Sequence, residues 1–186
     1  MIFCTRRTFL AAGGTLASGL PGGKSFIGGA AAAEDLPPAS PTVLAPPTMA
    51  PDIVFQQADG TEHRLSEFLG WGMVVNFWAT WCAPCVAEMP ALAALSRALA
   101  PHDIAVMPLS SDRGGAAVVR RFFDSQRIAG LPVLLDPKGA AGRQFDVQGI
   151  PSTVIIDKKG RLRARLDGAA DWSGPAIATR IRQLVG

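Results

Sequence analysis

The chain has 186 residues, a length that suggests one domain with extensions, because a single core commonly takes roughly 100–200 residues. Its 18 basic and 15 acidic residues give a formal charge of +3, but Arg6, Arg7 and Lys24 lie in an N-terminal stretch without acids. The remainder is balanced at 15 basic (18 − 3) against 15 acidic residues. This balance excludes the basic excess that is typical of nucleic-acid-binding proteins.

The first 33 residues have the organisation of an export signal. A basic pair precedes an apolar stretch from Phe9 to Leu20, and small residues follow it. The hexapeptide TRRTFL (residues 5–10) resembles a twin-arginine signal. Because the apolar stretch is shorter than the ~20 residues that span a bilayer, we expect cleavage near Ala33 and a periplasmic protein. An uncleaved signal would instead anchor the protein in the membrane.

Residues 34–51, EDLPPASPTVLAPPTMAP, separate this signal from the body of the chain. They carry six prolines and little periodic apolar pattern. Such a composition is typical of a semi-rigid extended linker.

Two cysteines, Cys82 and Cys85, remain in the mature chain if the signal and its Cys4 are removed. In an oxidising compartment, one pair of cysteines is either a structural staple or a redox centre. A staple stabilises mainly by closing a long loop of the unfolded chain, and this loop is short. The spacing therefore favours redox chemistry.

From residue 52 onward, strand and helix patterns alternate. Their order predicts an α/β fold, with a mixed central sheet and helices on both faces. We expect parallel strands early and an antiparallel hairpin late. The expected elements in chain order are a hairpin and a helical turn within 52–70, a strand at 73–79, a helix at 82–100, a strand at 103–111, a helix at 116–128, a strand at 131–136, a short helix near 140–145, strands at 152–157 and 161–168, and a last helix opened by Ser173 and Pro175.

Three features occur in an order that is specific to one superfamily. They are the segment WATWCAPC (78–85), a proline at position 90 inside the helix, and GIPSTVIID (149–157). Together they resemble the thioredoxin superfamily. The segment CVAEMP, with the extra strand and helix between Ala105 and Ile128, is similar to TlpA/ResA/DsbE-type thiol-disulfide oxidoreductases. The resemblance covers residues 44–186 and implies a thioredoxin-like domain with an N-terminal β-hairpin and a central strand-helix insertion.

The two thiols are expected to have different roles. Cys82 should lie at a helix N-terminus, where free N–H groups and the helix dipole favour the reactive thiolate. It is the expected nucleophile. Cys85, one turn further on, is placed to attack the mixed disulfide and release the product. The redox-active disulfide is the only cofactor that we expect.

The resemblance implies roles for four further residues. Ile150-Pro151 would form a cis peptide beside the disulfide, and the backbone of Ile150 would pair with an extended substrate. Trp81 would cover the active site. Glu88 would handle protons, because Asn76 stands where cytosolic thioredoxins carry a buried acid. The alternative for Glu88 is an exposed glutamate on the helix surface.

A reductase of protein disulfides is the expected activity, because Ala83 and Pro84 offer no side-chain donor that would stabilise the reduced form. The resemblance implies apocytochrome c or copper-site assembly proteins as substrates and a membrane thiol donor of the DsbD or CcdA kind. We expect a monomer without nucleic-acid partners.

A copper-binding metallochaperone of related fold is the main alternative. Such proteins resemble a Cys-x-x-x-Cys with a distant histidine, whereas this loop is one residue shorter. His63 and His102 are expected in exposed loops. A zinc site would need four ligands. A peroxidase is disfavoured because the proline and threonine that precede the peroxidase cysteine are absent.

Overall fold

The computed structural model describes residues 40–186, so the expected export signal and the first part of the linker lie outside the described residues. These residues form an eight-stranded sheet in the order β1-β8-β7-β4-β5-β6-β2-β3. The strands are β1 (Thr42–Met49), β2 (Val54–Gln57), β3 (Glu62–Arg64), β4 (Gly72–Trp78), β5 (Ile104–Ser110), β6 (Leu134–Leu135), β7 (Ser152–Ile156) and β8 (Arg161–Asp167). The helices are α1 (Ala83–Leu99), α2 (Gly115–Gln126), α3 (Ala140–Gln144) and α4 (Pro175–Val185), with short 3-10 turns at Leu65–Phe68 and Ala100–His102.

The sheet is mixed, as predicted. Strands β4, β5 and β6 run parallel to one another, whereas β7 pairs antiparallel with β4 and with β8. The N-terminal hairpin of β2 and β3 and the inserted β5 and α2 are also present. The α/β architecture expected from the alternating patterns is therefore confirmed.

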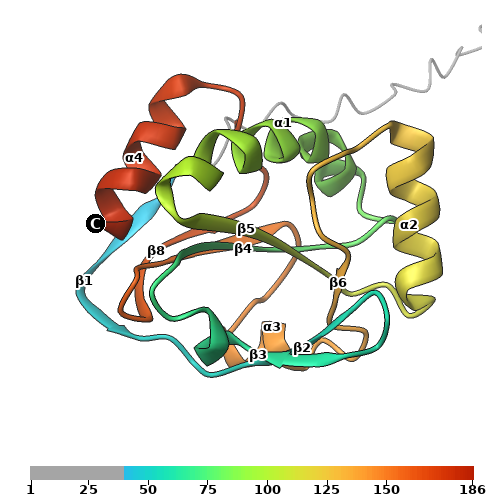
Figure 1. Cartoon of the computed structure of the whole chain (residues 1–186), viewed down its shortest axis with the longest axis horizontal. Coiled ribbons are helices and arrows are strands. Elements are labelled where there is room, and N and C mark those ends of the chain that lie inside the picture. Colours follow the sequence, from blue (N-terminus) through green and yellow to red (C-terminus); the bar gives the residue numbers. More distant parts are fainter. Residues whose placement is uncertain (1–39) are drawn as a thin grey trace, which may run out of the picture. The chain divides into compact units, whose positions relative to one another are not determined.

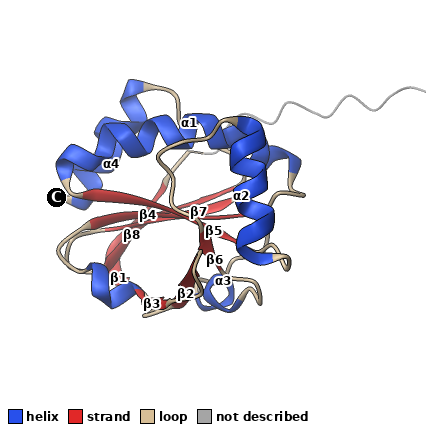
Figure 2. Cartoon of the chain, turned by 45° about the vertical axis from the view of Figure 1, so that its right-hand side comes forward, coloured by secondary structure: helices blue, strands red, loops and turns tan. Residues whose placement is uncertain are grey.

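Helices cover both faces of the sheet (Figures 1 and 2). Helices α1, α2 and α4 lie on one face, and α3 lies with the β2-β3 hairpin on the other. Strand β4 is buried at all of its positions, because its alternate side chains enter two cores. Val74 and Trp78 pack toward α1, whereas Val75 and Phe77 pack toward the hairpin. No helix within residues 40–186 is both long and apolar enough to cross a membrane.

The prediction of a linker is wrong for the residues that form β1, which are the outer strand of the sheet and pair antiparallel with β8. Its pairing is interrupted between Val43 and Thr48, and Pro46 and Pro47 fall within this interruption. An edge strand tolerates prolines because they need not donate to a ladder. Most β1 side chains are exposed, so burial imposed no periodic pattern on this segment.

Candidate active site

Cys82 lies in the connection between β4 and α1. It is the N-cap residue of α1, and its sulfur accepts a hydrogen bond from the backbone N–H of Cys85 at 3.3 Å. The two sulfurs form a disulfide. Helix α1 begins at Ala83 and contains Pro90 in its interior, as predicted. The reactive sulfur is therefore placed where free N–H groups stabilise a thiolate.

The two cysteines differ in access to solvent. Cys82 is 6% exposed and Cys85 is fully buried. Ala83 and Pro84, which separate them, are exposed. A large substrate can therefore approach the disulfide only from the side of Cys82, which agrees with its expected role as the nucleophile.

The loop of residues 147–151, called here the Pro151 loop, lies against the disulfide. The Ile150-Pro151 peptide is cis, as the resemblance implied. The carbonyl oxygen of Ile150 lies 3.6 Å from Sγ of Cys82. In the disulfide this is a contact without a hydrogen, whereas a reduced Cys82 thiol could donate to the carbonyl. The loop that the resemblance placed against the sulfurs, although far away along the chain, therefore lies beside them.

Sheet pairing explains why the two motifs meet. Strands β4 and β7 are antiparallel, and Phe77 near the end of β4 faces Ser152 at the start of β7. The residues after one strand and before the other must therefore lie at the same edge of the sheet. A groove of about 200 Å³ opens at this edge. Trp81, 70% exposed, lies at this groove, which Gln148, Gly149 and Ile150 also line.

Glu88 is buried, so the alternative of an exposed surface glutamate is wrong. Its Oε1 accepts a hydrogen bond from Asn76 Nδ2 at 3.0 Å, and its Oε2 accepts one from the N–H of Ala170 at 3.2 Å. Burial raises the pKa of Glu88, against the opposing effect of Ala170, Asn76 and the nearby indole of Trp172. By geometry the indole N–H of Trp172 falls short of a hydrogen bond. Glu88 follows Cys85 by one turn of α1.

Asn76 connects Glu88 to the centre of the sheet. Its Nδ2 also donates to Thr153 Oγ1 at 3.0 Å, whereas its Oδ1 has no partner within residues 40–186. The amide therefore orients the carboxylate but does not titrate itself. This arrangement fits the expectation that the acid of the site has moved from β4 to α1.

Asp112 is a site residue that the sequence did not reveal. Its carboxylate accepts hydrogen bonds from the N–H of Thr80 at 2.9 Å, the hydroxyl of Thr80 at 2.7 Å and the hydroxyl of Ser110 at 2.7 Å. These bonds fix the connection that carries Cys82. One signal could have indicated it, because polar residues at the carboxyl end of a parallel strand commonly serve a site.

Of the two histidines, His102 is exposed in the turn after α1, as expected, whereas His63 is half-buried on a strand and not in an exposed loop. His63 is on β3 and contacts Glu67 at 2.7 Å, and His102 contacts Arg182 at 3.2 Å. No cluster of three or more His, Cys, Asp or Glu side chains within residues 40–186 is arranged to hold a metal ion.

Known proteins resemble this chain in both sequence and fold. Residues 46–165 match the model of the AhpC/TSA family. The chain is 30% identical over 127 residues to the thiol-disulfide oxidoreductase ResA of Geobacillus kaustophilus (strain HTA426), covering 68% of this chain and 72% of that relative. It is 34% identical over 115 residues to the thioredoxin-like protein YneN of Bacillus subtilis (strain 168), covering 61% and 66%. The structure of a DsbE-type thiol:disulfide interchange protein from Chlorobium tepidum superposes with a TM-score of 0.66 at 24% identity, covering 75% and 97%. The likeness thus extends from the cysteine motif to the whole thioredoxin-like domain.

Proposed function

Since the chain belongs to the AhpC/TSA family and is a thiol-disulfide oxidoreductase similar to ResA, we propose that it reduces protein disulfides in the periplasm. Its substrates are apocytochrome c or proteins that assemble the copper site of cytochrome oxidase. A membrane thiol donor of the DsbD or CcdA kind returns electrons to it. The twin-arginine-like signal exports the chain, which acts as a monomer.

The surroundings of Cys82 support reduction as the direction of exchange. A CxxC pair becomes a strong oxidant when its reduced form is specially stabilised. Within the described residues, the one hydrogen bond to Sγ of Cys82 comes from the backbone N–H of Cys85. Ala83 and Pro84 add no side-chain donor, and a buried carboxylate one turn past Cys85 opposes a second anion nearby. The side chains around Cys82 therefore add no stabilisation of its thiolate beyond that of the helix N-terminus.

The reaction transfers two electrons from the dithiol to the substrate. The Cys82 thiolate attacks one sulfur of the substrate disulfide and releases the other as a thiolate. The Cys85 thiolate then attacks Sγ of Cys82 and releases the second substrate thiolate. The protein is left with its Cys82–Cys85 disulfide, as in the structure.

Glu88 supports the second step in this proposal. Cys85 is fully buried, so its proton must pass to a group inside the protein before the thiolate can attack. Because burial raises the pKa of Glu88, this carboxylate is a better proton acceptor than an exposed one. Asn76 and the N–H of Ala170 hold it in place.

Binding of the substrate falls to the Pro151 loop and Trp81. The backbone of Ile150 pairs with an extended substrate segment, and Pro151 shapes the loop beside the sulfurs. Trp81 provides exposed apolar area at the groove. A protein substrate would thus bind across the end of α1 with its disulfide above Cys82.

The reduction potential of the purified domain tests the direction. It can be measured by equilibration with glutathione or dithiothreitol. A potential well below about −200 mV is expected for a reductase, whereas one near about −120 mV, in the range of strong oxidants, would contradict the proposal.

A further inference from the structure

Arg165 joins the central sheet to the end of α3. It lies on β8, where Val154 of β7 and Thr42 of β1 are its partners on either side. Its Nη1 donates to the carbonyl of Phe145 at 2.7 Å, and its Nη2 donates to the carbonyl of Asp146 at 2.8 Å. Carbonyls at the end of a helix lack partners within the helix. A guanidinium held by the sheet therefore fixes the point at which the Pro151 loop begins.

The other end of the loop is joined to the same strand. Nε of Arg165 donates to Oδ1 of Asp167 at 2.9 Å, and the same oxygen accepts a hydrogen bond from the hydroxyl of Ser152 at 2.9 Å. The N–H of Gly168 donates to the carbonyl of Pro151 at 2.9 Å. The residues just before the Pro151 loop and those at its end are thus bonded to residues 165–168, and Arg165 and Asp167 are bonded to each other.

Residues 147–150 of the Pro151 loop line the groove that Trp81 also lines. We propose that Arg165 and Asp167 are positioning residues, which hold this loop where Ile150 can pair with a protein substrate. Neither residue hydrogen-bonds to Cys82 or Cys85 in the described part of the chain. Their effect is therefore on substrate binding, and the inference rests on the proposed exchange with protein disulfides.

The bonds from Arg165 are of the stronger kind, because the donor is a charged guanidinium. Without them the loop can adopt more conformations, and a protein substrate must order it again on binding. A small disulfide reacts at the sulfur without pairing to the loop. Loss of Arg165 should therefore weaken binding of protein substrates and leave reaction with a small disulfide unchanged.

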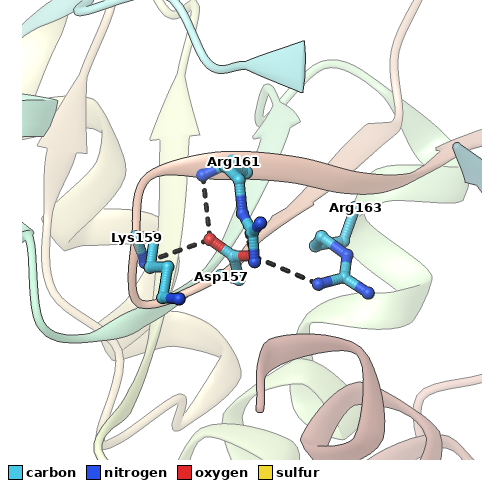
Figure 3. Close-up of polar contacts among 4 residues, drawn as sticks. All are labelled: Asp157, Lys159, Arg161 and Arg163. Carbon is cyan, nitrogen blue, oxygen red and sulfur yellow. Dashed lines mark hydrogen bonds and ion pairs between the residues drawn. The ribbon is translucent and has the colours of Figure 1, made fainter. Parts of the chain in front are cut away.

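Arg163 provides a matched control on the same strand. Its Nη1 donates to Asp157 Oδ2 at 3.2 Å, in a cluster that Arg161 and the N–H of Lys159 complete (Figure 3). This cluster lies at the β7-β8 turn, at the end of β8 away from Arg165 and Asp167. Each variant thus loses an arginine that bonds to a carboxylate, and only Arg165 also bonds to the residues that lead into the Pro151 loop.

The experiment compares Arg165→Met and Arg163→Met in the whole protein. Insulin serves as the protein disulfide and dithionitrobenzoate as the small disulfide. For Arg165→Met we expect KM for insulin to rise about tenfold, with kcat and the rate with dithionitrobenzoate unchanged. For Arg163→Met we expect KM for insulin, kcat and the rate with dithionitrobenzoate to match those of the parent. Arg165→Lys keeps the charge but lacks the planar fork that bonds both carbonyls and Asp167 at once, so its KM should lie between those of the parent and Arg165→Met.

Amide hydrogen exchange gives a readout that does not depend on activity. The N–H groups of residues 147–150 should exchange faster in Arg165→Met than in Arg163→Met. Three results for Arg165→Met would each overturn the inference. They are unchanged amide hydrogen exchange at residues 147–150, an unchanged KM for insulin, and equal slowing of the reactions with insulin and with dithionitrobenzoate. If Arg165→Met does not fold, an unchanged KM in Arg165→Lys would overturn it as well. If the reductase proposal fails, the parent protein will show a high reduction potential. The variants can then still be compared in the opposite direction of thiol-disulfide exchange, with the oxidised proteins and reduced insulin.

Discussion

Cys82 and Cys85 are 6% and 0% exposed, so an incoming protein reaches only the first sulfur. We expect Cys82→Ser to abolish exchange. Cys85→Ser should instead trap a mixed disulfide through Cys82, because the attacking sulfur remains and the resolving one is gone. Mass spectrometry of trapped adducts distinguishes the two variants. Substrates recovered on Cys85 in a Cys82→Ser protein would reverse the assignment.

Glu88 should make stability depend on pH. Burial raises the pKa of this carboxyl above its ordinary value of 4.5. The folded protein then holds the proton more tightly than the unfolded chain does, so the stabilisation is present below the ordinary value and is lost as the pH rises through the folded pKa. Glu88→Gln cannot ionise. The difference in Tm, that of Glu88→Gln minus that of the parent, should become more positive from about pH 4 to about pH 8. A difference that is the same at both pH values would contradict the buried charge.

The same variant also separates the proton role of Glu88 from its effect on stability. Without the negative charge, Cys82 should alkylate at lower pH. Resolution of the mixed disulfide should become slower, because the acceptor for the Cys85 proton is gone. Iodoacetamide reactivity against pH and single-turnover reduction of a model disulfide measure the two effects. If neither curve changes, Glu88 is only a structural carboxylate.

At the scale of the element, the connection between β4 and α1 depends on Asp112. Replacing it by Ala leaves the N–H and hydroxyl of Thr80 and the hydroxyl of Ser110 without their acceptor. We expect the free energy of unfolding to fall by about 2–3 kcal/mol. Urea unfolding measures this loss. Asp124→Ala, on the exposed side of α2, is the control and should change stability by less than about 0.5 kcal/mol. Equal midpoints for the two variants would show that Asp112 does not hold the connection.

Elements with a clear apolar period could be predicted from the sequence, because each buries a regular face. Helices α1, α2 and α4 and strands β4, β5 and β7 all lie where they were expected. Strand β1 was missed because it is stabilised by pairing with β8, far away in the sequence, and not by burial of its own side chains. Strand β6 is only Leu134–Leu135, shorter than the apolar run at 131–136 suggests. Pairing between distant strands leaves no local pattern.

The active site likewise has features that the sequence could predict and features that it could not. The cysteines, Pro90 and Pro151 could be predicted because spacing and order along the chain carry the signal. The partners of Glu88 could not, since Ala170 reaches it from 82 residues away. Arg165 contacts Phe145 from 20 residues away for the same reason. Local motifs thus identify the reacting atoms, and only the fold reveals the residues that hold them in place.

At the scale of the whole molecule, four strands meet at the edge that carries the disulfide. Trp78 at the end of β4 faces Ser110 at the end of β5, and Ser152 at the start of β7 faces Asp167 at the end of β8. The carbonyl of Trp78 accepts a hydrogen bond from the N–H of Ser111, and the hydroxyl of Ser152 donates to Asp167. Stability of the sheet and geometry of the site are therefore coupled, and the redox state of the disulfide should change the stability of the whole domain.

We expect the oxidised protein to be more stable than the reduced one. A thermodynamic cycle links stability to the reduction potential. Every 30 mV by which folding lowers the reduction potential of the disulfide makes the oxidised protein about 1.4 kcal/mol more stable than the reduced one. If folding lowers the potential by about 60 mV, the oxidised form gains about 3 kcal/mol. Its Tm should then be about 6–11 °C higher.

Thermal unfolding with and without dithiothreitol measures this difference. The variant with both Cys82→Ser and Cys85→Ser is the control, because it has no disulfide to reduce and its Tm should not respond to the reductant. A strong oxidant has the opposite property, since its reduced form is the stabilised one. A reduced protein with the higher Tm would therefore contradict the reductase proposal independently of any measured potential, because it would show that folding favours the dithiol.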